Sequence, residues 1–139
     1  PEMEWIEVSG SREHLARIQK FVLETAFRQG VPADLSQKIE LVLEEVLLNI
    51  FAHAYAQEES GKVETGCSLT APDLFHIRIV DEGRPFNPLA LPEPDTALSL
   101  EEREVGGLGV HLVREMADKV HYQRHKGHNI LDILFALAT

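Results

Sequence analysis

Cysteine and long apolar stretches are nearly absent from this chain of 139 residues. Cys67 stands alone, so neither an internal disulfide nor a cysteine metal cluster can form, and the seven histidines show no H-E-x-x-H spacing. No stretch is long and apolar enough for a membrane-spanning helix, and the first residues, PEMEWIEV, lack the basic region and apolar run of a signal peptide. We therefore expect a protein of a reducing, cytoplasmic compartment with no membrane partner.

Positive charge is also scarce. Lys and Arg number 13 against 23 Asp and Glu, which gives a formal net charge of -10. Binding to a nucleic-acid backbone needs a basic face, so this balance argues against a direct nucleic-acid partner. It favours a protein partner or a ligand that brings its own counter-cation. The length and the 44% hydrophobic content suit one domain, residues 1–139, with a substantial core.

Apolar periodicity predicts a succession of strands and helices along the chain. Strands are expected over 4–8, 63–70, 75–81, 119–124 and 129–137, and helices over 12–28, 33–55 and 108–118. Residues 84–105, with four prolines and an acidic LEERE stretch, form a long connection of the kind typical of functional lids or disordered segments. The order predicts an α+β two-layer sandwich, with three helices on one face of a mixed sheet.

The helix expected over 33–55 is the most hydrophobic in the chain, yet two polar residues lie among its apolar positions. At roughly 100° per residue, Glu45 and Asn49 fall between apolar residues on both flanks, whereas Glu44 falls on the solvent side. Inward polar groups are costly unless they are paired or hydrated. They are therefore either a satisfied polar pair in the core, or a carboxylate base beside a carbonyl-type ligand for Mg²⁺ on the wall of a pocket.

A buried strand, IRIVD, ends on the carboxylate of Asp81, and Gly83 follows two residues later. The pattern is typical of an ordinary turn, or of a site where a carboxylate faces a ligand and the backbone leaves room for it. Glycines return at Gly106, Gly107 and Gly109, where a helix is expected to begin. Unpaired amides at a helix N-terminus bind phosphate, but the same glycines also suit a hinge for the long connection.

These features stand in a fixed order: E-x-x-x-N on a helix, D-x-G at a strand end and G-x-G after a long connection. The order resembles the Bergerat-type ATP-binding fold of gyrases, histidine kinases, heat-shock chaperones and mismatch-repair ATPases. Within that superfamily, EVLLNIFAHAY, DEGRPFNP and GGLGVHLVREMADKV look most like the anti-sigma factor serine/threonine kinases. The resemblance extends over nearly the whole chain.

The resemblance implies a role for each residue of the first two motifs. Glu45 would be the general base that accepts the proton of an attacking hydroxyl. Asn49 would bind the Mg²⁺ that bridges the phosphates of ATP. Asp81 would accept a hydrogen bond from the adenine amino group, and Gly83 would let the base approach the backbone.

In the rest of the chain the resemblance is less complete. Gly107 and Gly109 would cradle the phosphates below the lid. Family members often carry a basic residue just before these glycines, near the γ-phosphate, but here Val105 stands in that neighbourhood and Arg103 is two residues earlier. Relatives also often carry a threonine on the last strand, near the nucleotide. Our alignment puts Asp132 there, where a carboxylate would repel phosphates unless it points away.

The resemblance implies a cytoplasmic, homodimeric kinase that uses ATP and Mg²⁺. It would sequester a sigma factor and phosphorylate a serine or threonine on a small antagonist protein. A second hypothesis is a nucleotide-dependent protein-binding module without kinase activity, which Val105 and Asp132 favour. A third, a detached histidine-kinase catalytic domain, ranks last, because we expect no helical hairpin with a phosphoacceptor histidine in a chain this short.

Overall fold

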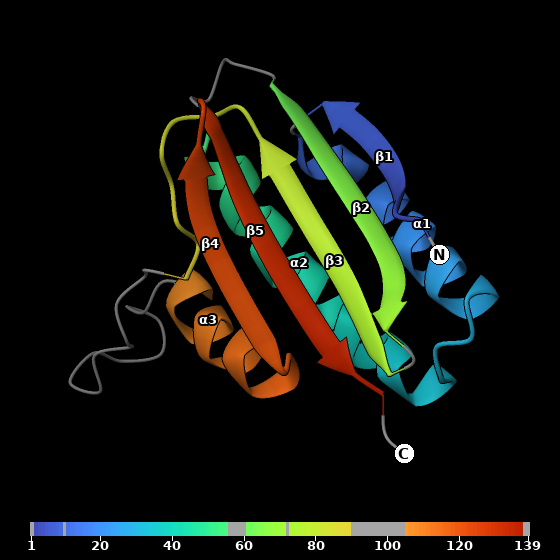
Figure 1. The fold of residues 1–139 in the computed structure, drawn as a ribbon. Coiled ribbons are helices and arrows are strands. Elements are labelled where there is room, and N and C mark those ends of the chain that lie inside the picture. The colour runs from blue at the N-terminus through green and yellow to red at the C-terminus, as the bar shows by residue number, and fades with distance from the viewer. Residues whose placement is uncertain (1, 10, 56–60, 72, 90–104, 138–139) are drawn as a thin grey trace.

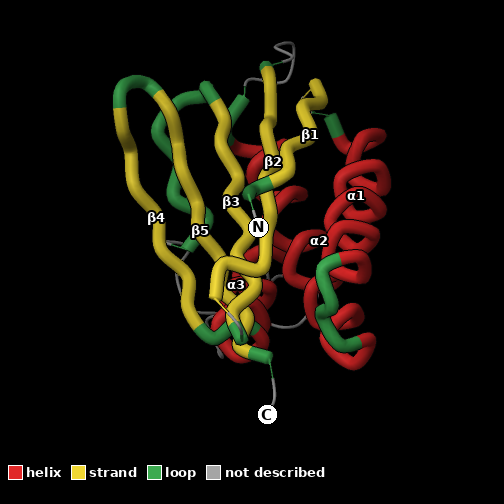
Figure 2. Tube along the Cα trace, turned by 45° about the vertical axis from the view of Figure 1, so that its right-hand side comes forward, coloured by secondary structure: helices red, strands yellow, loops and turns green. Residues whose placement is uncertain are grey.

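Five strands form one sheet, and the α-helices lie together on one of its faces in this computed structural model (Figure 1). The structure describes residues 2–9, 11–55, 61–71, 73–89 and 105–137. Turned to the side, the strands and the helices make two layers (Figure 2). For these residues, the predicted α+β two-layer sandwich with three helices on one face is confirmed.

Each predicted element is present with nearly the predicted bounds. The strands are β1 (Glu4–Ser9), β2 (Lys62–Ala71), β3 (Leu74–Asp81), β4 (Lys119–His125) and β5 (His128–Ala136). The α-helices are α1 (Leu15–Arg28), α2 (Ser36–His53) and α3 (Val105–Met116), and short 3-10 turns at Arg12–His14 and Ala33–Leu35 precede the first two. Because glycine has a low helix propensity, α3 was expected to start at residue 108; its backbone is helical from Val105 onward.

The strand order is β1–β2–β3–β5–β4, and every neighbouring pair in it is antiparallel. The mixed sheet expected from the sequence is therefore wrong. The connection through α3 does deliver β4 parallel to β3, as helical crossovers do. The tight turn at Lys126 and Gly127, both with positive φ, then folds β5 back between these two strands and separates them.

The core lies between the sheet and the helices. β3 alternates between a buried and a half-exposed face, and Phe75, Ile77 and Ile79 are buried toward the helices. α2 contributes a larger share of buried residues: Ile39, Val42, Leu43, Val46, Leu47, Asn49 and Ile50. Each fully buried apolar side chain of this size stabilises the fold by about 1.5–3 kcal/mol. Among the described residues, no helix combines the length and the apolarity that a membrane crossing requires.

Asp132 lies on the face of the sheet that the helices leave uncovered, because its β5 neighbours Leu131 and Ile133 occupy the buried face. Arg78, its cross-strand neighbour on β3, donates to both carboxylate oxygens (2.8 and 3.1 Å), and His76 Nε2 lies 2.6 Å from Oδ1. Burial raises the pKa of Asp132, but the hydrogen bonds from Arg78 and His76 outweigh it and leave the pKa lowered. The carboxylate of Asp132 therefore points away from the helices, which is the alternative that the sequence left open.

The turn after β3 docks on the C-terminal end of α2. Gly83 is buried there, and a Cβ atom at this position would lie 2.3 Å from the carbonyl oxygen of Ala54. The same carbonyl accepts the N–H of Arg84 (2.8 Å), and the Nε of Arg84 donates to the carbonyl oxygen of His53 (2.6 Å). Only glycine fits this approach, and it fixes the end of β3, with Asp81, against the end of α2.

Substituting Asp132→Asn removes a charge from the uncovered face but keeps the shape of the side chain. Because the pKa of Asp132 is lowered in the folded state, the ionised carboxylate stabilises the fold above its unfolded pKa, and this contribution is lost as the pH falls through the folded value. We expect the variant to lose about 1 kcal/mol of unfolding free energy at neutral pH, and the difference to be smaller at about pH 3. Urea titrations at both pH values measure it; an equal deficit at both would contradict it.

Substituting Gly83→Ala is expected to lower the unfolding free energy by about 2 kcal/mol or more, because the new Cβ meets the backbone of Ala54. Gly66→Ala is the matched control. Its Cβ would lie 2.7 Å from the ring of Trp5, a side chain that is 47% exposed and has room to move. Chemical denaturation of both variants should therefore show the smaller loss at Gly66, and equal losses would count against a special role for the turn.

Candidate functional site

Glu45 and Asn49 lie on α2, four residues and hence about one helical turn apart. Asn49 is 8% exposed, and its amide nitrogen donates no hydrogen bond within the described part of the chain. Glu45 is half-buried and has no ion pair with a described residue. No hydrogen bond joins Glu45 to Asn49, so the two do not form a polar pair that satisfies itself, and Asn49 is not among the fully buried described groups that lack a partner. The arrangement fits a site that a ligand completes.

The environment of Glu45 favours its protonated form. Burial is the main cause that raises the pKa of its carboxyl, and the neighbouring negative charge of Glu44 adds to it. Glu44 itself is exposed, as the helical pattern predicted. A carboxylate whose pKa is raised toward neutrality is a better general base than an ordinary surface glutamate.

Asp81, at the end of β3, is 2% exposed and lies on the same buried face as the core residues of its strand. Its Oδ1 accepts the backbone N–H of Gly83 (2.9 Å) and the side-chain Nδ2 of Asn129 (2.8 Å). Burial raises the pKa of Asp81, although both hydrogen bonds and the charges of Arg124 and His128 act in the opposite direction. The carboxylate is thus buried and held through one oxygen.

Asn129 belongs to this site and was missed in the sequence. It is the cross-strand neighbour of Asp81, and its side chain donates a hydrogen bond to the Asp81 carboxylate. The stretch NILDILF is apolar at both parities, which hides the strand's alternation. Counting outward from Leu131, which is buried, would have placed Asn129 on the helix side of the sheet and Asp132 on the other.

Gly107 and Gly109 lie in the first turns of α3, and α3 packs against α2, the helix that carries Glu45 and Asn49. The structure therefore brings the third motif to the helix of the first. Most of the predicted lid, residues 90–104, lies outside the described residues, and so does Arg103. Val105 is the first residue of α3.

The described residues do not form a closed metal site of their own. Within the described residues, no three His, Cys, Asp or Glu side chains gather closely enough to hold a metal ion. Magnesium tolerates few protein ligands when phosphate oxygens and water complete its shell. The side-chain oxygen of Asn49 suits such a shared shell.

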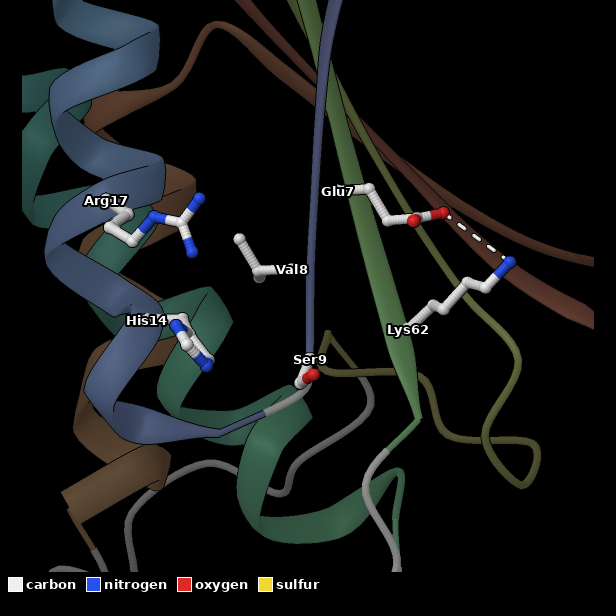
Figure 3. Close-up of a pocket in the computed structure, with 6 residues that line it drawn as sticks. All are labelled: Glu7, Val8, Ser9, His14, Arg17 and Lys62. Carbon is white, nitrogen blue, oxygen red and sulfur yellow. Dashed lines mark ion pairs between the residues drawn. The ribbon is translucent and has the colours of Figure 1, made fainter.

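A hollow of about 400 Å³ lies between β1 and α1, and none of the predicted site residues line it. Arg17 and His14 line it from the helix side, and Lys62 and Glu7 from the strands, where they form an ion pair of 3.5 Å (Figure 3). In the sheet, only β2 lies between β1, at this hollow, and β3, which carries Asp81.

Comparisons with curated proteins point to protein kinases. The chain is 29% identical over 108 residues to the serine/threonine-protein kinase BtrW of Bordetella bronchiseptica, which covers 78% of this chain and 75% of the relative. It is 24% identical over 126 residues to the serine-protein kinase RsbW of Bacillus subtilis, which covers 88% of this chain and 78% of the relative. These matches agree with the resemblance drawn from the motifs.

Solved structures agree on the fold. The RsbU and RsbW domains of a Mycobacterium tuberculosis protein match with a TM-score of 0.69 at 12% identity, over 99% of this chain and 33% of that one. The histidine kinase domain of the blue-light activated histidine kinase of Erythrobacter litoralis matches with a TM-score of 0.57 at 21% identity, over 90% of this chain and 60% of that one. The family profile described as histidine kinase-like ATPase domain matches residues 8–135, and the chain belongs to that family.

Proposed function

We propose that this protein binds ATP with Mg²⁺ and transfers the γ-phosphoryl group to a serine or threonine of an antagonist protein. From the resemblance to the anti-sigma factor serine/threonine kinases, we further propose that it sequesters a sigma factor, acts as a homodimer and works in the cytoplasm. The observation that carries the proposal is the pair on α2: half-buried Glu45, with a raised pKa, stands one turn before Asn49, which is 8% exposed.

The adenine end of the nucleotide is assigned to Asp81. Its Oδ1 already accepts two hydrogen bonds, and Oδ2 accepts none from a described residue. A buried carboxylate with one free oxygen favours a ligand that offers an N–H donor and disfavours one that offers an acceptor. The exocyclic amino group of adenine is such a donor. Gly83 keeps the turn close to α2 and leaves no side chain in the way.

The phosphate end is assigned to Asn49 and the start of α3. Asn49 would contribute a side-chain oxygen to Mg²⁺, and the amides around Gly107 and Gly109 suit phosphate, because the first turn of a helix carries unpaired N–H groups. When bound, Mg²⁺ supplies positive charge that neutralises the phosphate oxygens.

Glu45 is assigned the role of general base. The hydroxyl oxygen of the substrate forms a bond to the γ-phosphorus, and the bond from that phosphorus to the β–γ bridging oxygen breaks, leaving ADP. The hydroxyl proton passes to the carboxylate of Glu45. Because the raised pKa brings Glu45 closer to neutral pH, transfer should decline as the pH falls through that value.

A protein-binding module that holds a nucleotide without phosphoryl transfer is the second candidate. Val105 favours it, since phosphoryl transfer depends on positive charge near the γ-phosphate and valine supplies none. Asp132 no longer supports it, because this carboxylate lies on the uncovered face in contact with Arg78 and His76.

Isothermal titration calorimetry with ATP and Mg²⁺ tests the nucleotide site. Asp81→Asn should weaken ATP binding about 10- to 100-fold, because the amide nitrogen at the free position meets the adenine amino group, donor against donor. Asp132→Asn makes the same chemical change on the opposite face of the sheet and should leave ATP affinity unchanged. Equal affinities in wild type and Asp81→Asn would remove the adenine assignment.

Substituting Glu45→Gln tests transfer separately from binding. We expect at least about 100-fold slower phosphorylation with ATP affinity kept, because the base is lost but the shape remains. Glu44→Gln, the exposed neighbour, is the matched control and should phosphorylate normally. The readout is mass spectrometry of phosphoserine and phosphothreonine on the antagonist that co-purifies with each variant. Undiminished transfer by Glu45→Gln would exclude Glu45 as the base, and no transfer by wild type that binds ATP would favour the binding module.

A further inference from the structure

β4 is an edge strand of the sheet. Within the described residues it pairs with β5 alone, and no described segment lies beyond it where the sheet is turned to the side (Figure 2). An edge strand presents a row of backbone N–H and C=O groups without partners, and such a row is a template for a further strand. With seven residues, β4 is long enough to pair with a strand of ordinary length.

The register shows which backbone groups of β4 point outward. Asp118, just before β4, donates its N–H to the carbonyl oxygen of Leu134 (2.9 Å), so the even-numbered residues of β5 turn their backbone groups toward β4. In an antiparallel pair these groups bond the residues directly opposite, which are the odd-numbered residues of β4. The even-numbered residues therefore point their N–H and C=O groups away from the sheet: Val120, Tyr122 and Arg124.

Positive charge gathers along this edge and around the hairpin turn that follows it. Residues 119–131 contain no Asp or Glu, in a chain with a net charge of -10. Lys119, Arg124 and Lys126 are exposed, and none of them forms an ion pair with a carboxylate in the described part of the chain. The carboxylate of Asp132, on the neighbouring β5, already accepts hydrogen bonds from side chains of β3, so it does not offset this charge.

The opposite edge of the sheet carries the opposite charge, because β1 has two glutamates and no Lys or Arg. Lysines on an edge strand can serve only to keep other strands away. Charge of a single sign does more than that, since it repels a basic segment or the β4 of a second copy but attracts an acidic segment. The charge on β4 therefore selects among the strands that could pair with it.

We propose that β4 is a docking site for an acidic, extended segment of another protein, which adds to the sheet as a further strand antiparallel to β4. On the uncovered face its side chains would lie beside Lys119, His121 and His125, which suits glutamate or aspartate. On the helix side they would lie beside Val120 and Tyr122, which pack against the core and suit apolar residues. The segment is therefore one in which acidic and apolar residues alternate.

Other anionic partners fit this edge less well. Pairing with β4 requires the N–H and C=O groups of a peptide, which neither a nucleic acid nor a lipid surface offers in that spacing. A net charge of -10 also repels an extended anionic surface, whereas a short segment meets only the basic edge. The β1 strand of a second copy is acidic, but its glutamates already have partners, Glu4 with Arg28 (2.8 Å) and Glu7 with Lys62 (3.5 Å).

The probe is a short peptide in which glutamate alternates with valine, titrated into the isotope-labelled protein. Amide chemical shifts give the affinity, and amide hydrogen exchange shows where the peptide pairs. At saturation we expect the amides of Val120, Tyr122 and Arg124 to exchange at least about 10-fold more slowly, while the amides of β1 exchange as before. Protection of other amides, with these three unchanged, would overturn the inference.

Charge reversal tests the selectivity. The double variant Lys119→Glu, Lys126→Glu reverses two exposed charges of the edge, and we expect it to bind the peptide at least about 10-fold more weakly. The double variant Lys20→Glu, Lys38→Glu has the same net charge, with both changes on exposed helix positions, and should keep the wild-type affinity. Equal losses in the two double variants would mean that net charge alone drives binding, which contradicts a site on β4.

N-methylation of the valines in the peptide tests pairing separately from charge. The glutamates remain, but the N–H groups that antiparallel pairing directs at β4 are lost, so the affinity should fall at least about 10-fold. Undiminished binding of the methylated peptide would overturn the inference. So would equally tight binding of oligothymidylate at the same edge, or protection of the same three amides by raising the protein concentration without peptide.

The inference does not depend on the proposed function, because none of these measurements involves a nucleotide. A folded protein that binds the peptide but not ATP would support the docking site and contradict the nucleotide site.

Discussion

The close approach of Gly83 to the carbonyl oxygen of Ala54 is the constraint on which the rest of the site depends. It joins the end of a strand to the end of a helix with no side chain between them. The helix carries Glu45 and Asn49 upstream of this junction, and the strand ends on Asp81 beside it. The separation between the two ends of the site is therefore set by the length of α2, a rigid element, rather than by the turn. Under the proposed function, the length of the bound nucleotide would have to match this separation.

Two aspartates on adjacent strands show how the same side chain serves different ends. Asp132 lies on the uncovered face, where hydrogen bonds from Arg78 and His76 outweigh burial and lower its pKa. Asp81 lies on the buried face, where burial outweighs its hydrogen bonds and raises its pKa. The first arrangement favours the fold. The environment of Asp81 is unfavourable for its charged form when no ligand is bound. A buried carboxylate with one oxygen not used in a hydrogen bond is typical of binding sites.

The sequence predicts much of this from local patterns. Period and turn residues give each strand and helix within a few residues, and the helical angle of Glu45 and Asn49 predicts that they face inward while Glu44 does not. The features that the sequence could not predict depend on contacts between segments far apart in the chain. Nothing in the hairpin after α3 says that β5, rather than β4, lies beside β3, and so the sheet was expected to be mixed. Because β5 carries apolar residues on both faces, its alternation is also hidden, and Asn129 was missed as the partner of Asp81.

The charges around the turn give a reason why a divalent cation belongs in the proposed site. Arg84 and Arg124 are the cationic side chains that contact the turn in the described structure, and each donates to a backbone carbonyl oxygen, of His53 and of Gly83. They hold the turn at the base end of the site. The chain has a net charge of -10, and Val105 at the start of α3 supplies no positive charge. The N-terminus of a helix carries the equivalent of about half a positive charge. Under the proposed function, Mg²⁺ would supply further positive charge to the phosphates, with Asn49 as its proposed ligand.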